Sequence, residues 1–124
     1  MSKRNNQVGG NHYDMPIQPR VFIRLNNILF DEGNIIKYIC RYKKKNGLED
    51  LQKVLQYCDF IEESGEFGDS QCNMSSLEFS FKNNLSYEQS IIVFMVSDAV
   101  SLTTKERLGE IRKHTNKLIE KYKQ

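Results

Sequence analysis

The sequence predicts a small, mainly α-helical domain built on an antiparallel helical hairpin, and three observations support this fold class. Apolar residues between residues 31 and 63 recur at spacings of three and four, as they do on one face of a helix. The pair Asn46-Gly47 interrupts this pattern with residues that tolerate a left-handed backbone, so one helix can end there and reverse into the next. A length of 124 residues with 39% hydrophobic content allows one compact domain with a modest core.

The first helix of the hairpin is expected to be amphipathic. Its apolar positions lie three and four residues apart: Ile35, Ile36, Ile39 and Cys40. Its positive positions fall on another face: Lys37, Arg41 and Lys44. One face can therefore be buried while the other stays cationic.

The second helix continues both faces. Its apolar stripe contains Leu48, Leu51, Leu55 and Cys58, and its polar flank contains Asp50, Lys53 and Tyr57. An antiparallel hairpin sets Lys37 and Arg41 across from this polar flank. The arrangement fits either a solvated, salt-bridged surface or a site for an anion.

Two features favour the anion site. Gly33-Asn34 stands near the start of the first helix, where free backbone N–H groups and the helix dipole attract negative charge. Tyr38 and Tyr42 place flat apolar surfaces beside the cationic positions. From these residues we expect a phosphate with a ring attached.

Composition and charge exclude several classes of protein. A net charge of +2 is too small for general nucleic-acid affinity, and the basic run from Lys43 to Lys45 has no helix-turn-helix or zinc pattern beside it. Nucleic acid is therefore not an expected partner. The Walker and dinucleotide-binding glycine patterns are also absent.

The same sequence features predict a cytoplasmic protein with no membrane partner. No apolar run is long enough to cross a bilayer, and the first residues lack the hydrophobic segment of a secretory signal. Three cysteines are an odd number without metal-ligand spacing, and we expect them to be buried thiols in a reducing compartment.

Four regions are expected along the chain. Residues 1–8 are predicted to be a flexible arm, and residues 9–63 the hairpin module, which begins with a loop that contains two glycines and two prolines and leads into a short helix. Residues 64–76, rich in glycine, serine and acidic residues, are predicted to be a linker. Residues 77–124 are then a C-terminal helical segment that packs on the module or mediates oligomerisation.

Three local signals occur in this C-terminal segment. Apolar residues alternate over residues 77–81, which suits a minor β element or a short helical turn. Ser86 followed by Gln89 forms the pattern of a capping box, and Thr103 or Thr104 caps the final helix. The rhythm of the final helix fits the seam of a helix pair or of a homo-oligomer: Leu108, Ile111, Thr115, Leu118 and Tyr122.

Several short motifs lie at fixed positions in the first half of the chain: Gly10-Asn11-His12-Tyr13, Pro16-Ile17-Gln18-Pro19, Glu32-Gly33-Asn34, Lys37-Tyr38, Arg41-Tyr42, Lys44-Lys45-Asn46-Gly47, Glu49-Asp50-Leu51 and Lys53. With this set the chain resembles the SaV-like family of phage and prophage proteins, which is commonly labelled a domain of unknown function or a nucleotide kinase. The resemblance covers roughly residues 8 to 63. It implies a nucleotide-binding protein in the cytoplasm of a bacterial host, and a deoxynucleoside monophosphate kinase without a P-loop.

With this resemblance, the candidate residues divide the tasks of phosphoryl transfer. Lys37 and Arg41 are expected to grip phosphate oxygens, and these two residues with Asp50 are the expected catalytic set. Glu32 and Asp50 are the expected ligands of a Mg²⁺ ion, and a nucleoside triphosphate is the expected donor. The base is expected to stack on Tyr13 or Tyr38. The other expected substrate contacts are His12, Gly33, Asn34, Lys44 and Lys53.

Two alternative functions stay open. The chain can be a binder without chemistry, which holds a nucleotide or a signal molecule in order to counter host defence or to regulate. It can also be a protein-interaction module whose final helix engages a host protein. A homo-oligomer is expected whichever of these functions, the kinase included, is correct.

Overall fold

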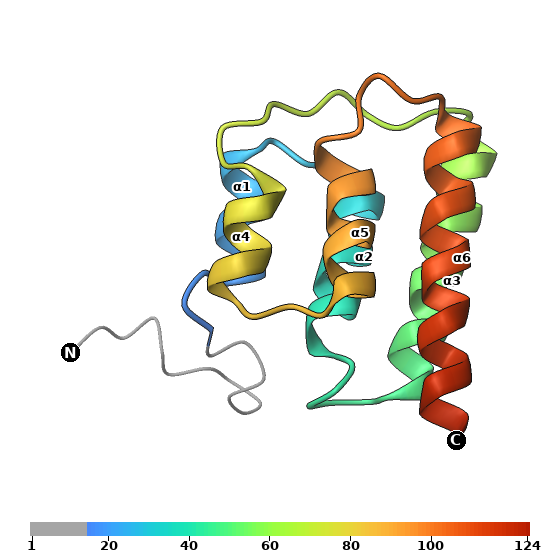
Figure 1. Ribbon diagram of the computed structural model, residues 1–124. Coiled ribbons are helices and arrows are strands. Elements are labelled where there is room, and N and C mark those ends of the chain that lie inside the picture. The colour runs from blue at the N-terminus through green and yellow to red at the C-terminus, as the bar shows by residue number, and fades with distance from the viewer. Residues whose placement is uncertain (1–14) are drawn as a thin grey trace.

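A computed structural model describes residues 15–124, and these residues form six α-helices and no strand (Figure 1). The helices are α1 (Pro19–Leu25), α2 (Phe30–Arg41), α3 (Leu48–Ser64), α4 (Ser76–Lys82), α5 (Tyr87–Ser97) and α6 (Thr104–Lys123). The expected mainly α-helical fold is confirmed. The predicted N-terminal arm, His12 and Tyr13 lie outside the described residues. No described helix is both long enough and apolar enough to cross a membrane.

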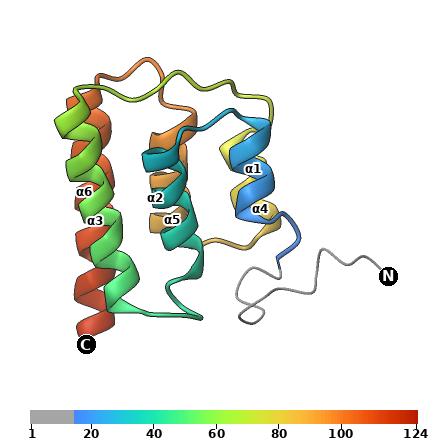
Figure 2. The same ribbon diagram turned by 180° about the vertical axis from the view of Figure 1, so that it is seen from behind.

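The six helices are arranged as two layers of three (Figures 1 and 2). One layer contains α1, α2 and α3, and the other contains α4, α5 and α6, so that α2 packs against α5 and α3 against α6. The largest fully buried side chains come from both layers: Phe22, Ile35, Ile36, Ile39, Leu51, Ile61, Phe79, Ile92 and Ile111. The core therefore lies between the layers, and each layer needs the other to cover its apolar face.

Local signals explain where most helices begin. Pro19 is in the first turn of α1, where its fixed backbone angle suits the helix and no N–H is required. Ser86 and Thr103 cap α5 and α6, each in a reciprocal capping box with the residue three positions on. Gly47, with φ of +53°, precedes α3 and lets the chain reverse after α2. These features confirm the predicted hairpin and the predicted caps.

Of the two alternatives for residues 77–81, the short helical turn is confirmed and the β element is wrong, because this segment lies within α4. Ser75 caps α4 by accepting a hydrogen bond from the Glu78 amide at 3.1 Å. Phe79 is fully buried, whereas Leu77 and Phe81 point outward and are 68% and 85% exposed. The alternation that resembled a strand arose because a seven-residue helix carries two solvent-facing apolar side chains.

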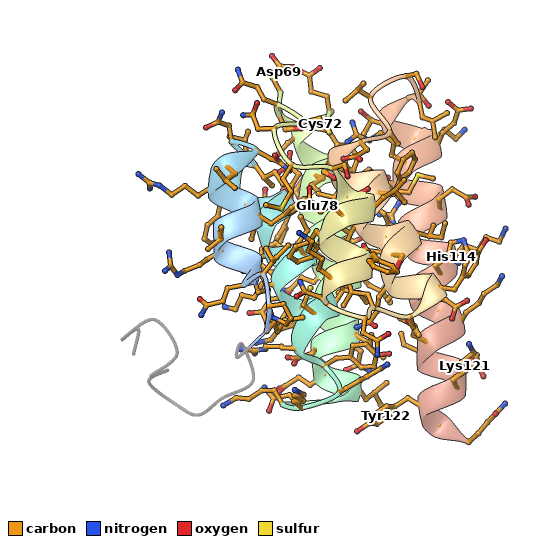
Figure 3. The ribbon with its side chains drawn as sticks, turned by 60° about the vertical axis from the view of Figure 1, so that its left-hand side comes forward. Asp69, Cys72, Glu78, His114, Lys121 and Tyr122 are labelled. Carbon is orange, nitrogen blue, oxygen red and sulfur yellow. The ribbon has the colours of Figure 1, made fainter. Side chains whose placement is uncertain are left out.

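The predicted seam on the final helix packs inside the chain. Leu108, Ile111, Thr115 and Leu118 are buried where α6 contacts α3 and α5. Tyr122 is half exposed, and it extends from the last turn of α6 over Gly47 at the start of α3 (Figure 3). The apolar rhythm is therefore satisfied within one chain and does not require an oligomer.

The segment between α3 and α4, predicted to be a linker, is bound to the first layer. The amide of Gly68 donates to Glu32 Oε2 at 2.6 Å, and the amide of Gln71 donates to the carbonyl of Asn26 at 2.8 Å. Phe67 is buried there, and the guanidinium of Arg107 lies 3.9 Å from the centre of its ring. This segment is thus an ordered connection across one end of the molecule (Figure 1).

The cysteines differ in their environments. The three thiols are free; Cys58 is buried, Cys40 is half-buried and Cys72 is exposed. Burial raises the pKa of Cys58 to about 12. The expectation of buried thiols therefore holds for Cys58 and is wrong for Cys72.

The second layer repeats the first at a constant difference in residue number. The first residue of α1, Pro19, corresponds to the first residue of α4, Ser76, and the first residue of α2, Phe30, corresponds to the first residue of α5, Tyr87. We call this difference the repeat offset. Asn27 and Asn84, which it also relates, have nearly equal positive φ angles, 53° and 54°. The turn after α1 and the turn after α4 are closed by the same hydrogen bond at 3.0 Å, from Ile28 to Ile23 and from Leu85 to Ser80.

Two buried or half-buried asparagines tie the layers together in matching ways. The Asn26 side chain accepts from the amide of Met74 at 2.8 Å and donates to its carbonyl at 2.9 Å. The Asn83 side chain accepts from the amide of Ile17 at 2.9 Å and donates to its carbonyl at 2.7 Å. Ile17 and Met74 are themselves related by the repeat offset. The bonds from Asn26 to Met74 and from Asn83 to Ile17 are therefore equivalent contacts, made once in each direction between the layers.

We expect Asn26→Ala to destabilise the fold by about 2–4 kcal/mol, because it removes a fully buried side chain and leaves partly buried backbone groups of residues 73 and 74 without this partner. Asn83→Ala should cost about 1–2 kcal/mol through the equivalent bonds to Ile17. Urea unfolding measures both changes. The matched control is Asn34→Ala, since Asn34 bonds only within its own helix turn at the surface; a loss as large as that for Asn26 would contradict the assigned role.

Candidate functional site

Three cationic side chains gather around the ring of Tyr38 on the outer face of the α2–α3 hairpin. The distances to the ring centre are 4.7 Å for Arg41 Cζ, 4.9 Å for Lys37 Nζ and 5.2 Å for Lys53 Nζ. Lys37 and Arg41 are one turn apart on α2, and Lys53 reaches the same ring from α3. We call Lys37, Arg41 and Lys53 the cationic cluster.

Arg41 is held by a buried carboxylate. Its Nε donates to Asp50 Oδ2 at 3.0 Å and its Nη2 donates to Asp50 Oδ1 at 3.1 Å. Asp50 is fully buried and also accepts from the amide of Asn46 at 3.4 Å. The pair joins the end of α2 to the start of α3 beside the connecting turn, and an aspartate in this position has no access to a ligand. Asp50 thus serves as a structural partner of Arg41, which differs from the expected catalytic and metal-binding roles.

The two lysines differ from Arg41, because neither forms an ion pair with a described residue. Each ammonium group instead lies near the face of Tyr38, where the electron-rich ring offers weak electrostatic attraction. Lys37 and Lys53 are therefore the positive charges of the cluster that a bound anion can neutralise.

The three cations of the cluster lie against the ring of Tyr38, and this ring is not accessible to a nucleotide base. It is only 7% exposed, and it stacks on Tyr57 with ring centres 6.0 Å apart. The expected stacking of a base on Tyr38 would have to displace both the cations and Tyr57. Open aromatic surface lies next along the same face, where Tyr57 contacts Phe30 and Phe60 with ring centres 6.2 Å and 5.3 Å away.

We call Phe30, Tyr57 and Phe60 the aromatic shelf. Phe30 is 76% exposed and Phe60 is 39% exposed, so two of its rings are open to solvent. Sequence reasoning missed Phe30 and Phe60, although a signal was present. Phe30 stands two helical turns before Lys37, and Phe60 two turns after Lys53, so both share a helix face with the cluster.

Gly33 and Asn34 do not form the expected anion site. The amide of Gly33 donates to the carbonyl of Leu29 at 2.8 Å, because α2 already begins at Phe30. Asn34 Nδ2 donates to the carbonyl of Phe30 at 2.8 Å. Gly33 instead allows close packing, since a Cβ atom there would lie 3.3 Å from Ile23 Cγ2.

Glu32 and Asp50 are not brought together. Glu32 is buried near the start of α2, nine residues and therefore roughly 14 Å before Arg41, the partner of Asp50. One Mg²⁺ ion cannot contact both carboxylates at that separation. No group of three or more metal-binding side chains occurs in residues 15–124. Lys44 is exposed in the turn after α2, beside the cluster but outside its ring contacts.

A hollow beside the shelf is acidic. A cavity of about 540 Å³ lies at the start of α2 and is lined by Leu29, Phe30, Asp31, Glu32, Ile61, Ser64, Glu66, Phe67, Gly68 and Asp69. Four of these residues are carboxylates and none is Lys or Arg. This face therefore changes along the hairpin from positive at the cluster, through aromatic, to negative at the cavity.

The second layer shows that the fold does not require the cationic cluster. At the repeat offset, Lys37 corresponds to Phe94 and Lys53 to Glu110. Helices α5 and α6 nevertheless pack against each other as α2 and α3 do. The cationic cluster is therefore a feature of the first layer alone, and the packing of two such helices does not depend on it.

Replacing Asp50 by Asn should destabilise the protein by about 2–4 kcal/mol, because a partly buried guanidinium loses its charged partner. Asp59→Asn is the matched control: Asp59 also pairs with an arginine, but its side chain is 71% exposed, so a change below about 0.5 kcal/mol is expected. Thermal or urea unfolding measures both. Equal effects would mean that the Arg41–Asp50 pair does not hold the hairpin closed.

Comparison with known proteins adds a family resemblance over the same region. Residues 10–59 match the model of a family described as a protein of unknown function (DUF3310). No curated protein and no solved structure matches the chain. The matched segment includes α1, α2 and most of α3, and it contains every residue of the cationic cluster. The chain is thus similar, over the part that carries this cluster, to a family whose function is unknown.

Proposed function

We propose that this protein binds a single nucleotide, with the phosphate on the cationic cluster and the base on the aromatic shelf. One observation carries the proposal: Lys37 and Lys53 converge with Arg41 on one ring without a described carboxylate of their own. The second layer shows that packing does not demand these charges. The resemblance to the SaV-like phage proteins, which are commonly labelled nucleotide kinases, supports the same class of ligand.

The chemistry of the three cations suits phosphate. Arg41 is oriented by its bidentate bond to Asp50, so little side-chain freedom is lost when an anion approaches it. Lys37 and Lys53 are point charges on flexible stems that can adjust to phosphate oxygens. Charge-assisted hydrogen bonds of this kind are about twice as strong as neutral ones.

The shelf offers a place for the ring. Phe30 lies seven residues before Lys37 on α2, which corresponds to roughly 10 Å along the helix. A base that stacks on Phe30 or Phe60 would cover apolar surface that now faces water.

The acidic cavity limits the length of the ligand. Beyond Phe30 the surface is lined by the carboxylates of Asp31, Glu66 and Asp69. A nucleic-acid strand that continued past the shelf would bring its next phosphates against these negative charges. The charge pattern therefore favours one nucleotide over an oligonucleotide.

The proposal concerns binding and not phosphoryl transfer. The carboxylate nearest the cluster, Asp50, is fully buried and paired with Arg41, so it cannot accept a proton from a substrate or hold a metal ion as arranged. Of the functions that the sequence suggests, a protein that sequesters or senses a nucleotide agrees best with this geometry. Such a protein returns its ligand intact after incubation with Mg²⁺ and a nucleoside triphosphate.

Lys37→Gln and Lys53→Gln should each weaken binding of deoxynucleoside mono- and triphosphates about 5- to 20-fold, because each removes one charge-assisted contact. Isothermal titration calorimetry with a panel of these nucleotides measures the change. Affinity should also fall as salt is raised.

Lys113→Gln is the matched control, since Lys113 is an exposed lysine on α6, away from the hairpin face. Arg41→Ala is unsuitable for this purpose because it also breaks the pair with Asp50. No heat of binding at millimolar nucleotide, or equal losses for Lys113→Gln and Lys53→Gln, would remove the proposal.

Phe30→Ala should weaken nucleotide binding about 10- to 100-fold while leaving the binding of inorganic triphosphate unchanged, because only the base uses the shelf. Phe81→Ala, at a similarly exposed phenylalanine on α4, is the control. A single-stranded oligothymidylate should bind no tighter per chain than one nucleotide. An effect of Phe30→Ala on inorganic triphosphate would contradict the assigned role of the shelf.

A further inference from the structure

We infer that the chain is two copies of one three-helix unit fused in tandem, and that the contact between its layers is a dimer interface enclosed within one polypeptide. The first unit contains α1, α2 and α3, and the second contains α4, α5 and α6. The repeat offset aligns the units without a gap from Ile17 with Met74 to Ile61 with Leu118. The kind of partner that this interface fits is a second copy of the same unit.

Identical residues recur at this offset. The pairs include Phe22 and Phe79, Asn26 and Asn83, Asn27 and Asn84, Ile35 and Ile92, Glu49 and Glu106, and Leu51 and Leu108. Most of these residues are either in the core or at the positive-φ turn. The differences include half-buried positions, such as Lys53 and Glu110, and buried positions, such as Asp50 and Arg107.

Contacts recur even where the side chains have changed. Phe30 meets the edge of Tyr57 with ring centres 6.2 Å apart and planes at 66°. At the equivalent positions Tyr87 meets His114 at 6.0 Å and 73° (Figure 3 labels His114). Since both residues of the pair differ between the units, the shared geometry comes from a repeated backbone.

The contacts between units are reciprocal, which is the signature of a twofold interface. Phe22 of the first unit stacks on its own counterpart, Phe79, with ring centres 4.4 Å apart. Asn26 binds Met74, which precedes the second unit, and Asn83 binds Ile17, which precedes the first. In an isologous dimer each residue makes the same contact in both directions, and these pairs do so within one chain.

The units differ in charge at the position of the site. Arg41 and Asp50 of the first unit correspond to Asp98 and Arg107 of the second, so the two charges are exchanged. Arg107 donates to the carbonyls of Met95 and Val96 at 2.8 Å and 2.7 Å instead of pairing with Asp98. If the proposed function holds, the chain therefore binds one nucleotide and not two.

A circular permutation that exchanges the order of the two units tests this inference. A circular permutant that starts at Asn73 and joins residue 124 directly to residue 1 keeps all 124 residues of the sequence. Twofold equivalence predicts that the distance from the end of α6 to the start of α1 equals the distance from the end of α3 to the start of α4. Residues 65–75 span the second of these distances, and the segment that precedes Met15 contains enough residues to span the first. We expect native helicity by circular dichroism and a melting temperature within about 5 °C of the original chain.

The matched control opens the same circle between Lys44 and Lys45, in an exposed turn inside the first unit. It has the same new junction but separates α2 from α3, so its melting temperature should fall by more than about 10 °C. An unfolded first permutant, or equal stability of the two, would overturn the inference. Because folding is the readout, failure here leaves the nucleotide proposal to its own titrations.

Discussion

The buried pair between Arg41 and Asp50 is the interaction on which the rest of the site depends. A carboxylate without solvent access is costly unless it is paired and hydrogen-bonded, and Arg41 provides two hydrogen bonds to it. The pair joins the end of α2 to the start of α3 and sets the guanidinium over Tyr38. Lys37 and Lys53 then reach the same ring, which leaves positive charge at the surface above a neutralised pair. In the proposed function Arg41 thus has two roles, since it pairs with Asp50 and also faces the bound phosphate.

The two units separate what the fold needs from what the first unit adds. Both bury the same pattern of apolar residues and both turn at an asparagine with positive φ after the short helix. Only the first unit carries the lysines Lys37 and Lys53; the second unit has Phe94 and Glu110 at the equivalent positions. Because α5 and α6 pack together without these lysines, helix packing does not explain why Lys37 and Lys53 are present in the first unit. This is the physical reason for proposing that the cluster binds a ligand.

Features set by local sequence could be predicted, and features set by distant contacts could not. The hairpin, the break at Gly47 and the caps at Ser86 and Thr103 follow from short-range patterns, and the structure confirms them. The side of α4 that faces the core, and the separation of Glu32 from Asp50, depend on how the layers stack. The burial of Tyr38 is also set by neighbours on α3. The repeat was visible in the sequence, as a phenylalanine four residues before an Asn-Asn pair in each half.

The most direct test of the central claim is a map of backbone amide chemical shifts by NMR during titration with deoxyadenosine monophosphate. The account predicts saturable shifts confined to residues 30–41 and 48–60, where the cluster and the shelf lie. The equivalent residues of the second unit, 87–98 and 105–117, serve as an internal control and should stay unchanged. Shifts that are centred on the second unit, or absent at saturating ligand, would contradict the account.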